Sequence, residues 1–165
     1  MKARRKARTV ALQALYELDC TRHPLEIVLG HRLEETALEP DLAAFARQMV
    51  IGVRGLAAAL DQQIARNAPE WPLEQMALID RNILRMAIWE FAVDGGTPIK
   101  VAINEAVELA KLFGSDSAPR FVNGVLGALA ARESELAQSL LAAQRTTISL
   151  ELSKKKSADD ADSHR

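Results

Sequence analysis

Apolar residues recur at steps of three and four positions along most of this chain, the spacing that gathers them on one face of an α-helix. The clearest series runs from Leu42 to Ile64 and keeps helical spacing for about six turns. The other series cover residues 3–20, 25–33, 76–91, 101–113 and 121–140. No stretch alternates apolar and polar residues for long enough to predict a strand. The pattern therefore predicts an all-α fold of about seven helices.

Prolines and glycines separate these series and mark the expected helix ends. Asn67-Ala68-Pro69 stops the longest series, and Gly95-Gly96-Thr97-Pro98 is a strong turn signal. Gly114 is expected to end a helix because glycine tolerates the left-handed conformation that is common at helix ends. The segment from Pro69 to Pro72 should form a rigid corner around Trp71, since each proline fixes its own backbone.

The composition indicates one helical domain followed by a polar tail. The chain has 165 residues, of which 48% are apolar and 4% aromatic, and it is rich in alanine and leucine, which favour helix. We expect a helical domain over residues 1–145 and a flexible tail over residues 146–165, where Ser, Thr, Lys and Asp become frequent. The single cysteine, Cys20, cannot form an internal disulfide, and no segment resembles a membrane span or a cleavable leader. We therefore expect a cytoplasmic protein.

Residues 1–8, which we call the basic arm, carry five cations and no acid. The formal net charge of the whole chain is only −1, so the arm is a local positive field suited to a polyanion. It continues directly into the amphipathic series of residues 3–20, with Tyr16 at the edge of the apolar stripe. Tyr16 either packs in the core or contacts a ligand beside the arm. A solubilising tail and a membrane anchor are rival interpretations of the arm, but its alanine-rich apolar face suits core packing better than lipid.

The residues that most enzymes and metal sites require are missing. The histidines are His23, His31 and His164, and none has a His, a Cys or paired carboxylates at metal-ligand spacing. The sequence contains no glycine-rich nucleotide loop, and a Ser-His-Asp triad would need a histidine from a predicted helix end. We therefore predict no catalysis, no cofactor and no metal.

Several polar residues fall within predicted helices. We interpret Asn104-Glu105 and Asn123-Gly124 first as packing devices, an amide that bonds to a loop and a glycine that lets helices approach, and second as a polar hole for a ligand. Trp71 and Trp89 are interpreted as corner and core packing. Four charged residues are interpreted first as a solvated face and second as a docking surface for a partner: Glu74, Asp80, Arg81 and Glu90.

Four stretches of the chain form a set: RRKARTVALQALY at 4–16, DRNILRMAIWE at 80–90, VAINEAVELAK at 101–111 and FVNGVL at 121–126. In this order and spacing they resemble the NusB family of bacterial transcription antitermination proteins. The resemblance covers residues 3 to about 131, nearly the whole predicted domain.

The resemblance implies two packed three-helix bundles with an extra helix. It also implies binding of the boxA element of ribosomal RNA transcripts, as single-stranded RNA, by a heterodimer with NusE, a small ribosomal subunit protein. NusE would couple the RNA to the RNA polymerase elongation complex. Position by position, the implied RNA contacts are Arg4, Arg5, Lys6, Arg8, Tyr16, Ser117, Arg120 and Phe121. The implied NusE contacts are Glu74 and Asp80.

Two positions depart from the family pattern. The family often has acidic residues where this chain has Ser117, beside the implied RNA face, and Gly127. Loss of the acid at position 117 is expected to tighten RNA binding. The alternative function is a helical protein–protein adaptor whose basic arm binds an acidic protein and no specific RNA. The apolar stripes are wide enough for a monomer or a homodimer.

Overall fold

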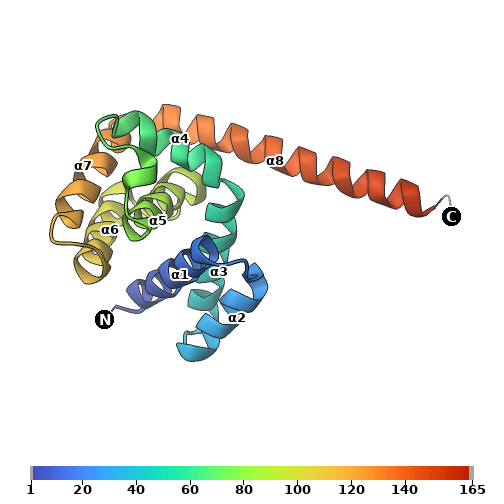
Figure 1. Ribbon diagram of the computed structural model, residues 1–165, viewed down its shortest axis with the longest axis horizontal. Helices are drawn as coiled ribbons and strands as arrows, with labels where there is room; N and C mark the ends of the chain where they lie inside the picture. Colours follow the sequence, from blue (N-terminus) through green and yellow to red (C-terminus); the bar gives the residue numbers. More distant parts are fainter. Residues whose placement is uncertain (1, 164–165) are drawn as a thin grey trace.

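The computed structural model describes residues 2–163, and this part of the chain contains helices and no strand (Figure 1). The all-α prediction is confirmed, with eight α-helices where about seven were expected. His164 lies outside the described residues. The α-helices are α1 (Ala3–Cys20), α2 (Leu25–Glu35), α3 (Pro40–Gly55), α4 (Ala57–Asn67), α5 (Leu78–Ile88), α6 (Ile99–Phe113), α7 (Ala118–Ala130) and α8 (Glu133–Asp162). A 3-10 helix, η1 (Leu73–Gln75), precedes α5, and a π-helix, η2 (Trp89–Asp94), follows it.

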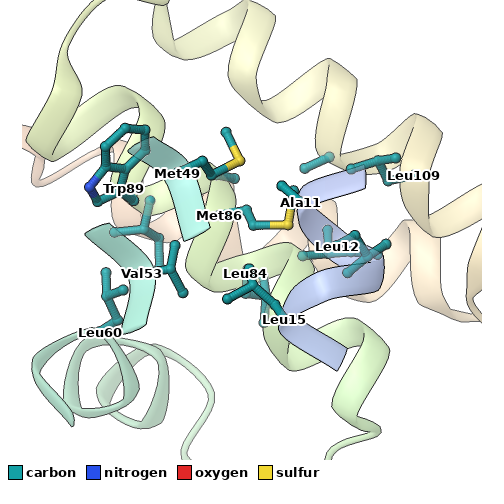
Figure 2. Packing of buried hydrophobic residues seen from close by; sticks show 14 of the residues in the cluster. Ala11, Leu12, Leu15, Met49, Val53, Leu60, Leu84, Met86, Trp89 and Leu109 are labelled. Atoms are coloured by element: carbon teal, nitrogen blue, oxygen red, sulfur yellow. The ribbon is translucent and has the colours of Figure 1, made fainter. Parts of the chain in front are cut away.

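The helices form two packed groups (Figure 1). In one group α1 packs against α2 and α3, and in the other α5 packs against α6 and α7 with α4 beside them. Because α5 also packs against α1, the two groups share one core. Figure 2 shows the buried side chains of Leu12 and Leu15 on α1 close to Leu84 and Met86 on α5. This arrangement agrees with the two-bundle fold that the sequence resemblance implies.

The longest apolar series forms two helices rather than the single one predicted. α3 and α4 are bent by 75° relative to each other, with Leu56 between them. Leu56 and Leu60 remain buried beyond the bend, so the apolar spacing carries no sign of it. No single helix within residues 2–163 is long and apolar enough to cross a membrane; α3 and α4 meet that criterion only as a bent pair, by length and composition.

Three glycines have identifiable roles in the fold, Gly114 and Gly52 because of space and Gly95 because of its backbone conformation. Gly114 does not adopt the left-handed conformation expected of it, since its φ is −92°. A Cβ at Gly114 would lie 2.6 Å from the Cβ of Ala118, so glycine is needed there for space. Gly95 is the residue with positive φ, at 72°, and it ends η2. At Gly52 a Cβ would lie 2.1 Å from the indole nitrogen of the buried Trp89, so this glycine allows the indole to pack on α3.

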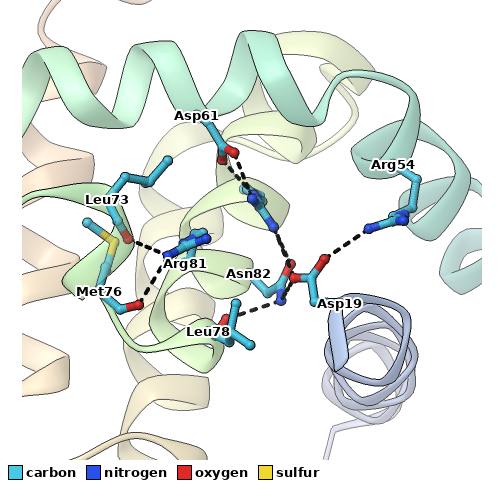
Figure 3. Close-up of polar contacts among 9 residues, drawn as sticks. Asp19, Arg54, Asp61, Leu73, Met76, Leu78, Arg81 and Asn82 are labelled. Atoms are coloured by element: carbon cyan, nitrogen blue, oxygen red, sulfur yellow. Dashed lines mark hydrogen bonds and ion pairs between the residues drawn. The ribbon is translucent and has the colours of Figure 1, made fainter. Parts of the chain in front are cut away.

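A polar network holds the C-terminal end of α1 (Figure 3). Asp19 accepts hydrogen bonds from Asn82 at 2.8 Å, from Arg54 at 2.9 Å and from Arg85 at 3.1 Å. Arg85 also donates to both carboxylate oxygens of Asp61 at 2.7 Å. Burial lowers the pKa of Arg85, but the bonds to Asp61 and Asp19 outweigh that effect and raise it. The network therefore ties α1 to α3, α4 and α5.

The apolar series of residues 121–140 is also divided, into α7 and α8, and α8 leaves the body of the molecule after about two turns (Figure 1). Leu136 and Leu140 are buried, whereas no residue from Leu141 to Ser163 is. Where the sequence predicts a flexible tail from residue 146, the structure has helix through Asp162. This part of α8 is held by the hydrogen bonds of its own backbone and by no buried side chain, so it is only marginally stable as a helix.

Candidate nucleic-acid interface

Residues 3–8 of the basic arm form the start of α1. The helix begins at Ala3, directly after Lys2, and its first turn contains no acid. Successive residues of a helix point about 100° apart, so the cations of the arm face different environments. Arg4 and Lys6 are exposed, Arg5 is half-buried and Arg8 is buried. The fold therefore divides the arm into cations that face solvent and cations that face other helices.

Arg8 forms a buried ion pair with Glu90 of η2. Its Nε donates to one carboxylate oxygen at 3.0 Å, and its Nη2 donates to the other. The Thr97 hydroxyl donates to the same carboxylate at 2.8 Å. The Arg8 and Glu90 side chains are only 4% and 2% exposed. The expectation that Glu90 lies on a solvated face is therefore wrong, because its charge is needed to neutralise Arg8 in the core.

Arg5 pairs with Glu105 of α6 through two hydrogen bonds, Nε to Oε2 at 3.0 Å and Nη2 to Oε1 at 3.1 Å. These bonds raise the pKa of Arg5 and lower the pKa of Glu105. The carboxylate also offsets part of the repulsion between the cations of the arm and the positive end of the α1 dipole. Arg5 and Arg8 together fix the start of α1 to the second group of helices.

Arg4 and Lys6, together with the exposed Lys2 that precedes the helix, are the cations of the arm that remain available to a ligand. Within residues 2–163, every ion pair of the arm involves Arg5 or Arg8. The guanidinium carbon of Arg4 lies 4.6 Å from the ring centroid of Phe45 on α3, a cation–π contact that positions Arg4 while leaving it exposed. Phe45 is a contact of the arm that the sequence did not indicate.

Tyr16 lies on the same face of α1 as Arg5, because eleven residues bring the helix through about three full turns. Its side chain is 42% exposed, which favours the interpretation of Tyr16 as a contact residue over core packing. Beside Arg5, a groove of about 430 Å³ is lined by Lys2 and by residues of α6 that include Asn104 and Lys111. Asn104 is exposed in this groove, so it does not have the buried packing role that was its first interpretation.

Ser117, Arg120 and Phe121 lie at the start of α7. α6 packs against α7 and also contacts the arm through Glu105. Ser117 and Arg120 are exposed, and Phe121 is half-buried. A hollow of about 390 Å³ is lined by all three together with Asp80, and α1 contributes no residue to it. The implied RNA contacts therefore form two groups, one on α1 and one on α7.

Trp71 belongs to the group on α7, a position that sequence reasoning missed. The predicted corner is present, since the backbone N–H of Trp71 donates to the Ala68 carbonyl at 3.0 Å. The indole is not packed inside that corner: it is 55% exposed, and its ring lies 6.2 Å from the ring of Phe121 at an interplanar angle of 47°. An aromatic residue between two prolines was the available signal, because a rigid turn can hold a side chain outward.

The implied partner contacts lie near this second group. Glu74 is exposed in η1. One carboxylate oxygen of Asp80 is buried without a hydrogen-bond partner among residues 2–163, and burial raises the pKa of this carboxyl. Across the same described residues, no group of three or more His, Cys, Asp and Glu side chains is arranged to hold a metal ion. The chemistry available at both groups is therefore charge pairing, hydrogen bonding and aromatic stacking.

The chain is similar in sequence to proteins of one family. A sequence model of the NusB family matches residues 5–131. The transcription antitermination protein NusB of Roseiflexus castenholzii is 50% identical over 134 residues, which cover 80% of this chain and 94% of that protein. The protein of the same name from Dehalococcoides mccartyi strain CBDB1 is 46% identical over 127 residues, covering 77% and 89%.

Solved structures of similar proteins agree with the fold. The structure of T. maritima NusB has a TM-score of 0.71 at 30% identity, covering 83% of this chain and 92% of that one. A crystal structure of the antitermination factors NusB and NusE in complex with dsRNA also has a TM-score of 0.71, at 24% identity, covering 78% and 96%. At that identity the second likeness supports the fold alone.

Proposed function

Because this chain belongs to the NusB family, we propose that it is a transcription antitermination factor that binds boxA RNA together with NusE. The observation that carries the proposal is the first two turns of α1. There Arg4 and Lys6 face solvent on a helix whose position is fixed by the Arg8–Glu90 and Arg5–Glu105 pairs. Cations held in fixed positions can match the spacing of phosphates along an RNA strand.

In this proposal the two groups of residues have different roles. Arg4 and Lys6 bind phosphates, Arg5 and Tyr16 extend that contact along α1, and Arg8 positions the arm through Glu90. Residues of the second group contact bases and the strand beyond the arm: Ser117, Arg120 and Phe121. Affinity then comes mainly from phosphates, and sequence preference comes from bases and from the partner.

We further propose that NusE docks on the acidic surface that includes Glu74 and Asp80. Asp80 is suited to this role because it is half-buried and lines the hollow beside Ser117, where a donor from the partner can approach its carboxylate. The complex would reach the RNA polymerase elongation machinery indirectly, in the cytoplasm, and the protein would act without catalysis and without a membrane.

The test is a titration of labelled boxA RNA with the full chain, with and without NusE, against a scrambled RNA of equal length. Preference for boxA that increases when NusE is added supports the proposal. Equal affinity for both RNAs at physiological salt contradicts the specificity. Full retention of binding by a variant with alanine at Arg4 and Lys6 contradicts the role of the arm.

A protein–protein adaptor is the second candidate, and one observation favours it: Arg5 and Arg8 both bind carboxylates in this fold. The absorbance ratio of protein purified at low salt separates the two functions, because copurified nucleic acid supports RNA binding and its absence supports the adaptor.

We propose that residues 1–145 form the functional domain and that residues 146–163 are a mobile extension; the last two residues of the predicted tail, 164–165, lie outside the described residues. The exposure of every residue from Arg145 to Ser163 except the half-buried Thr147 supports this boundary. A chain truncated after Arg145 should keep its urea midpoint and its boxA affinity, and hydrogen exchange should be fast throughout 146–163 in the full chain. A large loss of stability on truncation would contradict the boundary.

A further inference from the structure

Trp71 and Phe121 form an aromatic ridge with a hollow on each side. One is the hollow of about 390 Å³ that is lined by Ser117 and Asp80. The other, which we call the glycine hollow, has a volume of about 400 Å³ and is lined by residues that include Asn67, Trp71, Arg120 and Gly124. The proposed RNA and NusE contacts do not specify what occupies this second hollow.

Gly124 keeps the glycine hollow open. It lies inside α7, where glycine costs roughly 0.5–1 kcal/mol relative to alanine. Its φ is not positive, and a Cβ at this position would meet no atom within 4 Å. Neither backbone conformation nor close helix packing therefore requires a glycine at position 124, and the packing role first expected of it is wrong. The absence of a side chain at Gly124 leaves room beside the indole of Trp71.

One arginine lines the hollow, and a second is bonded to a residue that lines it. Arg120 is exposed and lines it directly. Arg132 does not line the hollow, but it is exposed and donates from Nη2 to the side-chain oxygen of the lining residue Asn67 at 2.8 Å. Among the lining residues the one carboxylate is that of Glu70, which is exposed to solvent. An aromatic surface flanked by arginines is the arrangement by which proteins bind single-stranded nucleic acid, with stacked bases and paired phosphates.

We infer that the glycine hollow receives a nucleobase of the bound RNA, stacked on Trp71, while Arg120 and Arg132 pair with flanking phosphates. Phe121 supports the indole from a ring centroid 6.2 Å away, and the 55% exposure of Trp71 leaves indole surface for a base. The inference rests on the proposed RNA binding and adds Trp71, Gly124 and Arg132 to it. A nucleobase fits these observations better than a protein side chain does, because the flanking cations suit a polyanion.

Tryptophan fluorescence tests the inference directly. The chain has two tryptophans, and Trp89 is only 6% exposed, so a stacked base can quench only Trp71. Labelled boxA RNA is titrated into the full chain, and the RNA anisotropy and the protein emission are recorded together. We expect the emission to fall with the same midpoint as the anisotropy. An abasic strand of equal length supplies the phosphates without the bases and should bind without quenching.

Two variants measure the contribution of the contact. Trp71→Leu should abolish the quenching and weaken RNA binding about 5- to 150-fold, the fold-change that corresponds to about 1–3 kcal/mol of base stacking. Gly124→Leu should fill the hollow and weaken binding within the same range. Its matched control is Gly127→Leu, because Gly127 is also exposed in α7, has open space at its Cβ and does not line the hollow. Both leucine variants should retain helicity and unfolding midpoint.

The outcomes separate this inference from the proposed function. If Trp71→Leu and Gly124→Leu both bind RNA with full affinity, and RNA does not quench the emission of the unchanged chain, the stacking is overturned. The proposed function then still stands. No RNA binding by the unchanged chain overturns both. Quenching by NusE alone, lost in Gly124→Leu, assigns the hollow to the protein partner and also overturns the inference.

Discussion

The basic arm and the aromatic ridge of Trp71 and Phe121 differ in how much of their surface the fold leaves free. The arm shows five cations in sequence, yet Arg5 and Arg8 are held by carboxylates of the second group of helices. The ridge carries no cluster of charge in sequence, yet Trp71 is more than half exposed. Charge in a sequence is therefore an upper limit on charge available to a ligand, whereas exposed aromatic surface depends on how turns are placed.

The largest effect expected from this comparison is on stability and comes from Arg8. Arg8→Ala would leave the Glu90 carboxylate buried without its cation, and removal of one partner of a buried ion pair costs about 3–5 kcal/mol. Urea unfolding followed by circular dichroism measures this loss. Lys6→Ala is the matched control, since Lys6 is an exposed cation of the same helix and should change stability by less than about 0.5 kcal/mol. Equal effects of the two substitutions would contradict the division of the arm.

The next effect is on RNA binding and comes from the cations that face solvent. If Arg4 and Lys6 each neutralise one phosphate, their replacement by alanine reduces the slope of log affinity against log salt by about 1.4, which is about 25-fold in affinity at 0.1 M salt. Binding isotherms at several salt concentrations measure this slope. Arg5→Ala should change the slope less, because Glu105 already balances the Arg5 charge. If Arg5→Ala changes this slope more than the replacement of Arg4 and Lys6 does, Arg5 is the cation that binds phosphate.

The sequence predicted the helical class, most helix positions and the arm because these depend on local spacing and composition. The bend at Leu56 was not predictable from spacing, since the apolar stripe continues through it on both helices. Glu90 was misread for a related reason: its partner Arg8 lies 82 residues earlier, and only the packing of α1 against the second group brings the two together. The exposure of Trp71 likewise depends on the direction in which its turn points, which residue types alone do not specify.

A smaller effect, on the pH dependence of stability, should have opposite signs in the two regions. The pKa of Glu105 is lowered by its bonds to Arg5, so its contribution is present above the unfolded pKa and is lost as pH falls through the folded value. The pKa of Asp80 is raised by burial, so its charged form destabilises the fold above the folded pKa, and acid relieves that penalty. Unfolding of Glu105→Gln and Asp80→Asn between pH 3 and 7 measures both contributions.

At neutral pH we expect Glu105→Gln to destabilise the protein and Asp80→Asn to stabilise it, each by roughly 1 kcal/mol, because Arg5 is partly exposed, desolvation offsets part of the gain at Glu105, and Asp80 is only half-buried. Both differences from the unchanged chain should shrink as the pH falls. Asp80→Asn is also the variant that should weaken NusE, if the docking surface is correctly proposed. If Asp80→Asn is more stable and binds NusE with unchanged affinity, the Asp80 carboxylate is not needed for stability or for NusE docking.

The smallest effect concerns Ser117, which lines the same hollow as Arg120. Ser117→Asp would add a negative charge near the proposed path of the RNA, and a single exposed charge is worth about 0.5 kcal/mol, or about 2- to 3-fold in affinity. The loss should appear at low salt and disappear near 1 M, where the Debye length is about 3 Å. Gly127→Asp, which adds the same charge one turn beyond Gly124 on α7, should have a weaker effect. If both aspartates weaken binding equally, the RNA responds only to net charge, and the α7 group, unlike the arm, would not contact it.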